Sequence, residues 1–309
     1  MKLHKLVAST VGLSHEEWLE FRRKGIGGSD AGAICGLNPY RTAINVFLDK
    51  TEQGQITEDN EAMRQGRDLE QYVAERFTES TGKKVRRANS MFYNEQYPFM
   101  LANVDRLIVG ENAGLECKTA SAYSADKWKD GQIPESYEIQ CHHYMAVTGA
   151  DAWYIAVCIL GKDFKWQRIE RDEEMIQMLI EIEKKFWNEN VLLGQMPSPD
   201  GSKASDEILK KYYPNSRQIK LYGFDEKLQR RKEISELIEK LEKEKKQIEQ
   251  EVKQYMQDNE KAKSDSFEVS WKEITQRRID TEKLRAEQPK IYNQYLKTYQ
   301  MRKFGVKDV

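Results

Sequence analysis

Two carboxylates and an amine are spaced in this sequence so that they can converge on one point. Asp105 ends a strand-like segment, FMLANVD, and Glu116 and Lys118 lie two residues apart in the next one, AGLECKTA. Because alternate residues of a strand share a face, Glu116 and Lys118 point to one side and Cys117 to the opposite, buried side. A hairpin-like return of the chain brings Asp105 beside Glu116.

This set of groups fits the hydrolysis of a phosphodiester, which needs a nucleophilic water and a stabilised leaving oxygen. Hard divalent ions held by carboxylate oxygens supply both. We predict that Asp105, Glu116 and the backbone carbonyl of Cys117 bind Mg²⁺ (or Mn²⁺), with two ions expected. Lys118 would orient or deprotonate the water and stabilise the developing charge. A surface salt bridge is the alternative interpretation, but charges inside apolar strands are costly and favour a functional site.

Further polar residues lie on two predicted helices. Gln140 and Tyr144 are one turn apart and share a helix face, where they could hold the attacking water or a phosphate. Glu70 is a candidate additional metal ligand, and core packing or ordinary helix polarity is the alternative for Tyr144 and Glu70. His142 and His143 point to different faces of their helix and have no partner at zinc-ligand spacing. We therefore interpret them as a core or DNA-facing pair.

The elements that must position these residues change character along the chain. Hydrophobic periodicity and capping signals predict helices over 14–24, 42–52, 59–81, 135–148 and 172–193. Within 26–40 they predict a turn at Gly27-Gly28 and then a second helix that ends at Gly36 with Pro39. Ser14 and Glu17 form a capping box, and Ser29 or Asp30 is expected to cap the second helix. Strands are predicted over 85–93, 99–109, 113–120, 152–160 and 163–171, the last two joined by a hairpin turn. The order predicts an α/β (α+β) core with a mixed sheet of about five strands.

Composition shifts after this block and suggests three regions. Residues 1–195 form the predicted catalytic core, 196–224 a linker or exposed loop, and 225–309 a charge-rich helical extension. Within the extension we expect a long helix over about 225–263, a strand-like segment over 266–274, a helix around 279–299 and a basic C-terminal end. Ile234, Leu241, Ile248 and Tyr255 repeat every seven residues, but Leu237, Glu244 and Glu251 give only one apolar partner. Such a seam favours a short antiparallel hairpin or a helix on the core over a long parallel coiled coil.

The overall composition narrows the class of protein. Lys and Arg number 50 and Asp and Glu 51, so no global basic excess indicates nucleic acid, although a local groove would suffice. The four cysteines are widely spaced, which disfavours a disulfide framework or structural zinc. No apolar run reaches the length of a membrane span. We expect a cytoplasmic protein without a membrane partner.

The arrangement resembles the YqaJ-like viral recombinases of the phage lambda exonuclease family, within the restriction-endonuclease-like superfamily and its PD-(D/E)XK motif. The resemblance is carried by Trp18, Arg22 and Ser29, by Asp105, Glu116 and Lys118, and by Gln140 and Tyr144. It covers residues 14 to about 193. The C-terminal extension departs from the smaller lambda-type enzyme, so a ring-shaped trimer is not assumed, although a homo-oligomer is among the expected partners.

The resemblance implies a restriction-endonuclease-like core with a central mixed sheet flanked by helices. It also implies a Mg²⁺-dependent exonuclease that degrades one strand of duplex DNA from a 5′ end. The product would be a 3′ single-stranded tail for a single-strand annealing protein. Arg22 and Ser29 would bind the 5′-terminal phosphate, and Asn103 stands where the family has another small polar phosphate contact. No iron–sulfur cluster is expected, because the late cysteine ligands of some relatives are missing.

Two other functions remain open from the residues alone. The same site could serve an endonuclease or flap-processing nuclease that needs no DNA end. Alternatively, the chain could be a DNA-binding scaffold whose charged extension recruits partners. The scaffold hypothesis would require a basic face, which the near-neutral charge balance does not support.

Overall fold

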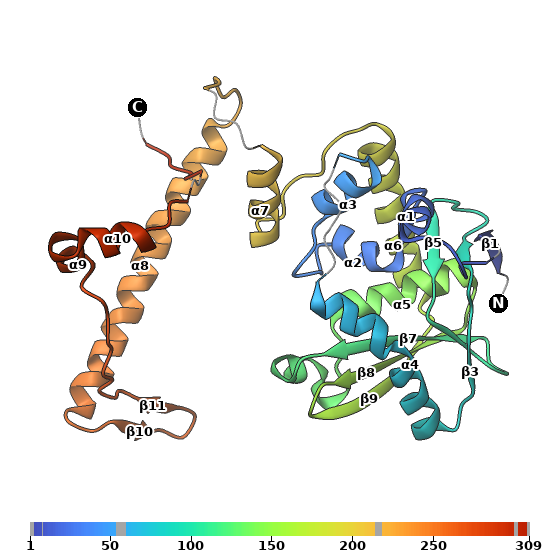
Figure 1. Ribbon diagram of the computed structural model, residues 1–309, viewed down its shortest axis with the longest axis horizontal. Helices are drawn as coiled ribbons and strands as arrows, with labels where there is room; N and C mark the ends of the chain where they lie inside the picture. The colour runs from blue at the N-terminus through green and yellow to red at the C-terminus, as the bar shows by residue number, and fades with distance from the viewer. Residues whose placement is uncertain (1–2, 8, 54–59, 214–217, 300–301, 308–309) are drawn as a thin grey trace. The chain divides into compact units, whose positions relative to one another are not determined.

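The computed structural model describes residues 3–7, 9–53, 60–213, 218–299 and 302–307. The chain forms two compact units, Met1–Pro214 and Asn215–Val309, whose helices are labelled in Figure 1. Residue 59, where the fourth helix was expected to start, lies outside the described residues, as do parts of the predicted linker and of the basic C-terminal end. Within the described ranges, no helix has the length and apolar character needed to cross a membrane.

A five-stranded mixed sheet lies at the centre of the first unit. Its order is β3 (Val85–Arg87), β6 (Arg106–Ile108), β7 (Ala113–Ala120), β8 (Ala152–Ile159) and β9 (Asp163–Glu170). Strands β7 and β8 are parallel and all other neighbours are antiparallel. The connection from β7 to β8 passes through a 3₁₀ segment (Ala122–Gly131) and α5 (Glu135–Thr148). The predicted mixed sheet of about five strands is confirmed.

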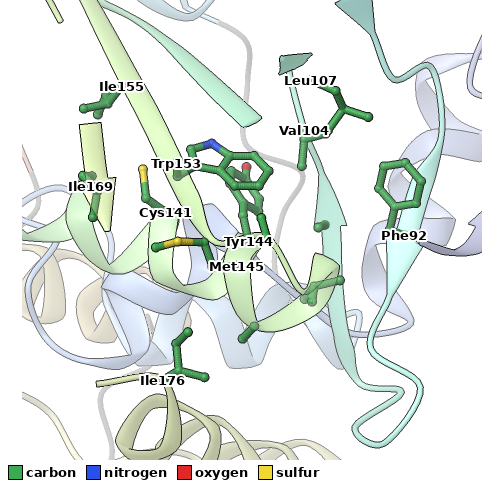
Figure 2. Packing of buried hydrophobic residues seen from close by; sticks show 14 of the residues in the cluster. Phe92, Val104, Leu107, Cys141, Tyr144, Met145, Trp153, Ile155, Ile169 and Ile176 are labelled. Carbon is green, nitrogen blue, oxygen red and sulfur yellow. The ribbon is translucent and has the colours of Figure 1, made fainter. Parts of the chain in front are cut away.

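Helices cover both faces of this sheet. Helix α4 (Glu61–Thr81) packs Val73, Ala74 and Phe77 against one face. Helix α5 covers the other face, where Tyr144 and Met145 lie against Trp153 and Ile155 of β8 (Figure 2). The rings of Tyr144 and Trp153 are 5.2 Å apart between centroids. This packing fixes the helix that carries Gln140 and Tyr144 directly over the sheet.

Two predicted strands are each divided between two sheets. The segment 85–93 turns at Asn89, whose φ is 49°, and forms β3 and then β4 (Met91–Tyr93). The segment 99–109 likewise forms β5 (Met100–Asn103) and β6. A second sheet, in the order β1 (His4–Val7), β4, β5 and β2 (Ile26–Gly27), holds the other halves. The break between β5 and β6 places Asp105 at the junction of the two sheets.

The N-terminal helices position a second group of polar residues. Helix α1 (His15–Arg23) begins with the predicted capping box of Ser14 and Glu17. Helix α2 (Gly28–Ile34) differs from the prediction, because Gly27 is its N-cap and Asp30 is its third residue, accepting a hydrogen bond from the Gly27 N–H. Helix α3 (Ala43–Lys50) follows as predicted.

The predicted linker 196–224 contains a helix that belongs to the first unit. Helix α6 (Glu173–Lys185) continues into a π-helical segment (Phe186–Leu192), and α7 (Lys203–Tyr212) comes after it. Ile208, Leu209 and Tyr212 of α7 pack against a cluster that includes Phe47 and Phe186. The compact unit therefore extends beyond the predicted boundary at residue 195.

The second unit is built around α8 (Asp225–Met256), a 32-residue helix. It ends before the predicted residue 263, because Gln257 adopts a left-handed φ of 49° and the chain enters a hairpin of β10 (Lys261–Lys263) and β11 (Glu268–Ser270). The predicted helix over 279–299 is two short helices, α9 (Thr281–Glu287) and α10 (Pro289–Tyr295). Proline at 289 disfavours helical geometry at the preceding residue and accounts for the break.

Candidate active site

The predicted carboxylates come together at the centre of the first unit. Asp105 lies between β5 and β6, and its Oδ2 accepts a 2.8 Å hydrogen bond from the Cys117 N–H of β7. The antiparallel register of β6 and β7 pairs Arg106 with Leu115, which brings Asp105 to the level of Glu116. Glu116 is 4% exposed. The hairpin-like return predicted between these strands is confirmed.

Glu116, Lys118 and Gln140 form one hydrogen-bonded group. Lys118 Nζ is 2.6 Å from Glu116 Oε1 and donates to Gln140 Oε1 at 3.0 Å. Gln140 Nε2 donates to the same Glu116 oxygen at 2.7 Å and is 2.9 Å from the Tyr144 hydroxyl. The strand period and the helix turn thus place all four side chains at a single site.

The electrostatics of this group are dominated by crowded negative charge. Burial, followed by the repulsion of Glu116 and Glu70, raises the pKa of Asp105 well above its usual value. Burial alone would lower the pKa of Lys118, but the attraction of Glu116, Tyr137 and Asp105, together with the hydrogen bond to Glu116, outweighs burial and raises the pKa of the ammonium group. A charged ammonium cannot accept a proton, so the arrangement favours the orienting role of Lys118 over the predicted role as a base.

The donor set fits a divalent cation. Glu116 Oε2 is buried and has no hydrogen-bond partner, although an unpaired buried carboxylate oxygen is costly. A hard cation between Asp105 and Glu116 would satisfy this oxygen and relieve the repulsion that raises the Asp105 pKa. No three His, Cys, Asp or Glu side chains within the described ranges gather as a complete metal-binding group. The binding of a cation by Asp105, Glu116 and the Cys117 carbonyl stays a prediction.

Glu70 reaches the edge of the site from α4 but is held by another residue. It forms an ion pair with Arg106, whose side chain is 3% exposed. Arg106 also donates to the Asp105 carbonyl at 2.7 Å and to Gln71 Oε1 at 3.0 Å. Glu70 is close enough to raise the Asp105 pKa, so the structure places it at the site with its charge already balanced by Arg106.

The residues predicted to bind phosphate form a separate group on α1 and α2. Arg22 donates a 3.0 Å hydrogen bond to Ser29 Oγ, and its guanidinium carbon lies 4.9 Å from the centroid of the Trp18 ring. Ser29 is exposed in the first turn of α2. These contacts hold the guanidinium and the hydroxyl together, in a geometry that suits a phosphate oxygen.

A buried cluster of charged residues contacts Arg22. Asp30 has no exposed surface and lies 2.8 Å from Lys50 and 3.4 Å from Arg22, and it also pairs with Arg41. Burial alone would raise the pKa of Asp30, but these three cations together hold it well below its usual value. Lys50 in addition donates to the Arg22 carbonyl at 2.8 Å. The backbone and the side chain of Arg22 are thus both fixed.

Gly28 lies where the residues predicted to bind phosphate approach Gln140 and Tyr144. A Cβ atom at this position would lie 2.6 Å from Tyr144 Cε1 and 3.0 Å from Gln140 Cγ. Only glycine permits so close an approach of the start of α2 to α5. The first turn of α2, with Ser29, is therefore held against the face of α5 that carries Gln140 and Tyr144.

The remaining predicted residues have different surroundings. The Asn103 carbonyl accepts a 3.3 Å hydrogen bond from the Tyr144 hydroxyl, and the Asn103 side chain is exposed. His143 is fully buried between Glu183, at 2.7 Å, and the Leu101 carbonyl, at 2.8 Å. His142 is also buried. Both histidines are core residues, one of the two alternatives predicted.

Three contributors were not identified from the sequence, namely Arg106, Tyr137 and the cluster around Asp30. Lys118 Nζ lies 4.6 Å from the centroid of the Tyr137 ring, which stacks on Trp128. Helical spacing carried a signal for Tyr137, because it lies three residues before Gln140 and on the same side of α5. Adjacency in sequence was the only signal for Arg106 and Asp30, which directly follow Asp105 and Ser29.

The fold is that of known exonuclease structures. The solved structure of LHK-Exo in complex with dAMP has a TM-score of 0.50 with this chain at 20% identity, covering 64% of this chain and 98% of that one. Another structure identifies LHK-Exo as an alkaline exonuclease from Laribacter hongkongensis. At this level of identity the likeness shows the fold alone. It shows that the chain has the mixed α/β fold of that structure.

Sequence comparisons define the family. Residues 17–151 match the YqaJ-like viral recombinase domain. The chain is 44% identical over 315 residues to the uncharacterized protein YqaJ of Bacillus subtilis (strain 168), and the match covers 100% of this chain and 99% of that protein. The chain belongs to the family of YqaJ-like viral recombinases, as the motifs in its sequence predicted.

Proposed function

We propose that this chain is a Mg²⁺-dependent 5′→3′ exonuclease that acts on linear double-stranded DNA. It would leave 3′ single-stranded tails and act with a single-strand annealing protein. The observation that carries the proposal is the buried pair of Asp105 and Glu116 with an unpaired oxygen on Glu116. Membership of a recombinase family and a fold shared with an alkaline exonuclease support a nuclease role.

Each residue of the site has a distinct task in this proposal. Asp105 and Glu116, with the Cys117 carbonyl, would hold Mg²⁺, which activates a water and neutralises charge on the leaving oxygen. Lys118 stays charged and stabilises negative charge at the scissile phosphate. Gln140 fixes the orientation of both Glu116 and Lys118 through the hydrogen bonds described above.

Preference for a 5′ end would come from Arg22 and Ser29. A guanidinium binds a terminal phosphate through two parallel hydrogen bonds, and Ser29 adds a donor at the start of α2. Because Gly28 holds that turn against α5, a phosphate bound there lies on the same side of the fold as Gln140. By binding the 5′-terminal phosphate, the enzyme would then place the first phosphodiester bond of that strand at the site.

A single set of DNA substrates tests the proposal. Linear duplex with and without a 5′-phosphate and closed circular duplex are incubated with the protein in Mg²⁺ and in EDTA. We expect release of mononucleotides from 5′ ends of the phosphorylated linear duplex in Mg²⁺ alone. Nicking of the circle would favour an endonuclease, and intact substrates throughout would favour a binding protein.

The Arg22→Lys variant separates end recognition from catalysis. It retains a positive charge but cannot bind phosphate in the bidentate geometry of arginine. We expect it to lose the preference for phosphorylated over unphosphorylated ends and to keep residual cleavage of both. An unchanged preference would remove Arg22 from the phosphate site.

A further inference from the structure

Helix α8 of the second unit, labelled in Figure 1, carries an exposed apolar seam. Ile238, Leu241 and Ile248 are 50%, 63% and 55% exposed, and Ile234 and Leu237 extend the seam toward the N-terminus of the helix. Among the residues of this unit that the structure describes, only Met256 has a buried side chain. A helix of 32 residues is about 48 Å long, so the unpaired apolar surface spans several turns.

The seam has the repeat of a helix that packs against another helix. Ile234, Leu241, Ile248 and Tyr255 recur every seven residues, and Ile238 and Val252 lie three residues before Leu241 and Tyr255. Those two positions supply the second apolar row that Glu244 and Glu251 could not. Lys245 interrupts this row, but its ammonium points to Glu249 at 3.8 Å and so leans away from the seam.

Acidic residues border the seam on both sides. Glu242 and Glu249 flank one edge and Glu244 and Glu251 the other, at the positions that face a partner helix across a seam. Several lysines of the same stretch, including Lys243 and Lys246, lie on the opposite side of the helix. The surface that a partner would meet is thus apolar in the middle and negative at its margins.

These charges decide which occupant fits. In a parallel pair of two α8 helices Glu244 would face Glu249 of the other copy, and in an antiparallel pair glutamates of the same edge would face each other. Like charges across a seam oppose pairing, so a second copy of this helix is disfavoured. The negative margins also disfavour the DNA backbone.

We propose that the seam of α8 is a docking surface for an amphipathic helix of a partner protein whose apolar stripe is bordered by lysine or arginine. Pairing would bury the exposed apolar residues and place opposite charges along both margins. This inference concerns the second unit and does not rest on the proposed nuclease activity.

Designed peptides test the chemistry of the seam directly. A fluorescent peptide of about four heptads carries Ile and Leu in its apolar stripe and Lys at the flanking positions. A matched peptide carries Glu at the flanks, and a scrambled peptide keeps the Lys composition without the stripe. With the full chain, fluorescence anisotropy should show that the Lys-flanked peptide binds about tenfold more tightly than either of the others. This preference should weaken as salt increases.

Variants of the full chain assign the binding to the seam. Leu241→Ser with Ile248→Ser should abolish binding of the Lys-flanked peptide, and the matched change Lys243→Ser with Gln250→Ser on the opposite side should leave it unchanged. Replacing Glu242, Glu244, Glu249 and Glu251 with Lys should reverse the preference toward the Glu-flanked peptide. This reversal does not depend on whether the serine variants keep α8 folded.

Three results would overturn the proposal. Equal binding of the Lys-flanked, Glu-flanked and scrambled peptides would show that the flanking charges select nothing. Absence of binding by any peptide would show that the seam does not accept a helix. A dimer in light scattering that Leu241→Ser with Ile248→Ser converts to a monomer would identify a second copy as the occupant.

Discussion

At the scale of single residues, the site is arranged for chemistry at the expense of stability. Asp105 is held beside Glu116 and Glu70, and the unpaired Glu116 oxygen is buried. Without a bound cation, Glu116 and Glu70 repel the charge of Asp105, and one buried oxygen of Glu116 lacks a partner. The residues that we assign to metal binding are therefore the ones whose neutral replacement should cost the fold least.

Asp105→Asn tests this reasoning. The amide keeps an oxygen that can accept the Cys117 N–H and removes the charge that burial and Glu116 oppose. Because the folded-state pKa of Asp105 is raised, ionising it at neutral pH costs free energy that Asn does not incur. We expect the free energy of unfolding at pH 7 to rise by about 1 kcal/mol. Cleavage should fall by at least about a thousandfold, as measured by urea titration in EDTA and a nuclease assay in Mg²⁺.

Asp126→Asn is the matched control, because the Asp126 side chain is 77% exposed and is not one of the residues assigned to the site. We expect it to change neither measurement. Loss of stability in Asp105→Asn would mean that the carboxylate contributes to the fold even without a cation.

Residue spacing predicted the central group because its geometry is local. The period of two in β7 places Glu116 with Lys118, and one helical turn places Gln140 with Tyr144. The contacts of Arg106 with Glu70 and Gln71 depend instead on how α4 docks on the sheet, which spacing does not encode. Sequence reasoning therefore predicted which candidate residues lie together and missed the residues that contact them.

At the scale of elements, the close approach of α2 to α5 connects the two halves of the site. Gly28→Ala should displace α2, because its Cβ would lie 2.6 Å from the Tyr144 ring. We expect the free energy of unfolding to fall by about 1–3 kcal/mol. Cleavage of 5′-phosphorylated duplex should fall more than cleavage of unphosphorylated duplex, because Ser29 moves with α2.

Gly66→Ala provides the control for this prediction. Gly66 lies within α4, and a Cβ there would lie 3.8 Å from the nearest atom, an ordinary contact. Alanine is favoured over glycine in a helix by about 1 kcal/mol, so this variant should be slightly more stable. Equal behaviour of the two variants would show that α2 tolerates displacement.

The buried cluster around Asp30 links α1, α2 and α3 through charge. Asp30→Asn would leave buried Lys50 with only the partly exposed Asp49, 4.0 Å away, as a counter-charge, and we expect a loss of about 3 kcal/mol at neutral pH. The folded-state pKa of Asp30 is depressed, so its contribution is complete above the unfolded value of 3.8 and is lost as the pH falls toward the folded value. Urea titrations should show a constant difference from pH 7 to about pH 5 that narrows below pH 3.8.

Asp49→Asn serves as the comparison, since Asp49 is partly exposed and contacts Arg41 at 3.2 Å. Its loss should cost less than about 1 kcal/mol. A pH-independent effect of Asp30→Asn would show that the carboxylate acts through packing and not through its charge.

Element types were largely predictable, and the divisions of strands were not. Alternation and turn residues predicted strands over 85–93 and 99–109, but each segment passes from one sheet to the other. The left-handed turn at Asn89 and the break around Asp105 depend on pairing between distant strands. Local periodicity contains no information about which sheet a strand joins.

At the scale of the whole molecule, the two units differ in how much apolar surface they bury. The three hydrophobic clusters consist entirely of residues from the first unit. The predicted boundary at 195 was too early, because α7 reads as polar in sequence while Ile208, Leu209 and Tyr212 pack against the third cluster. A short amphipathic helix following a Pro- and Gly-containing loop resembles a linker until its packing is seen.

This distribution of burial predicts that a chain ending at residue 214 folds without the second unit. Its thermal midpoint should lie within about 3 °C of that of the full chain, because the apolar surface that stabilises the fold is retained. Cleavage of linear duplex should persist, since all the site residues lie within the first unit. Binding of the Lys-flanked peptide should be lost completely, because α8 is absent. Calorimetry, a nuclease assay and anisotropy on the two chains measure these quantities. Loss of cleavage by a folded truncated chain would show that the second unit contributes to catalysis, whereas retained peptide binding would place the docking surface outside α8.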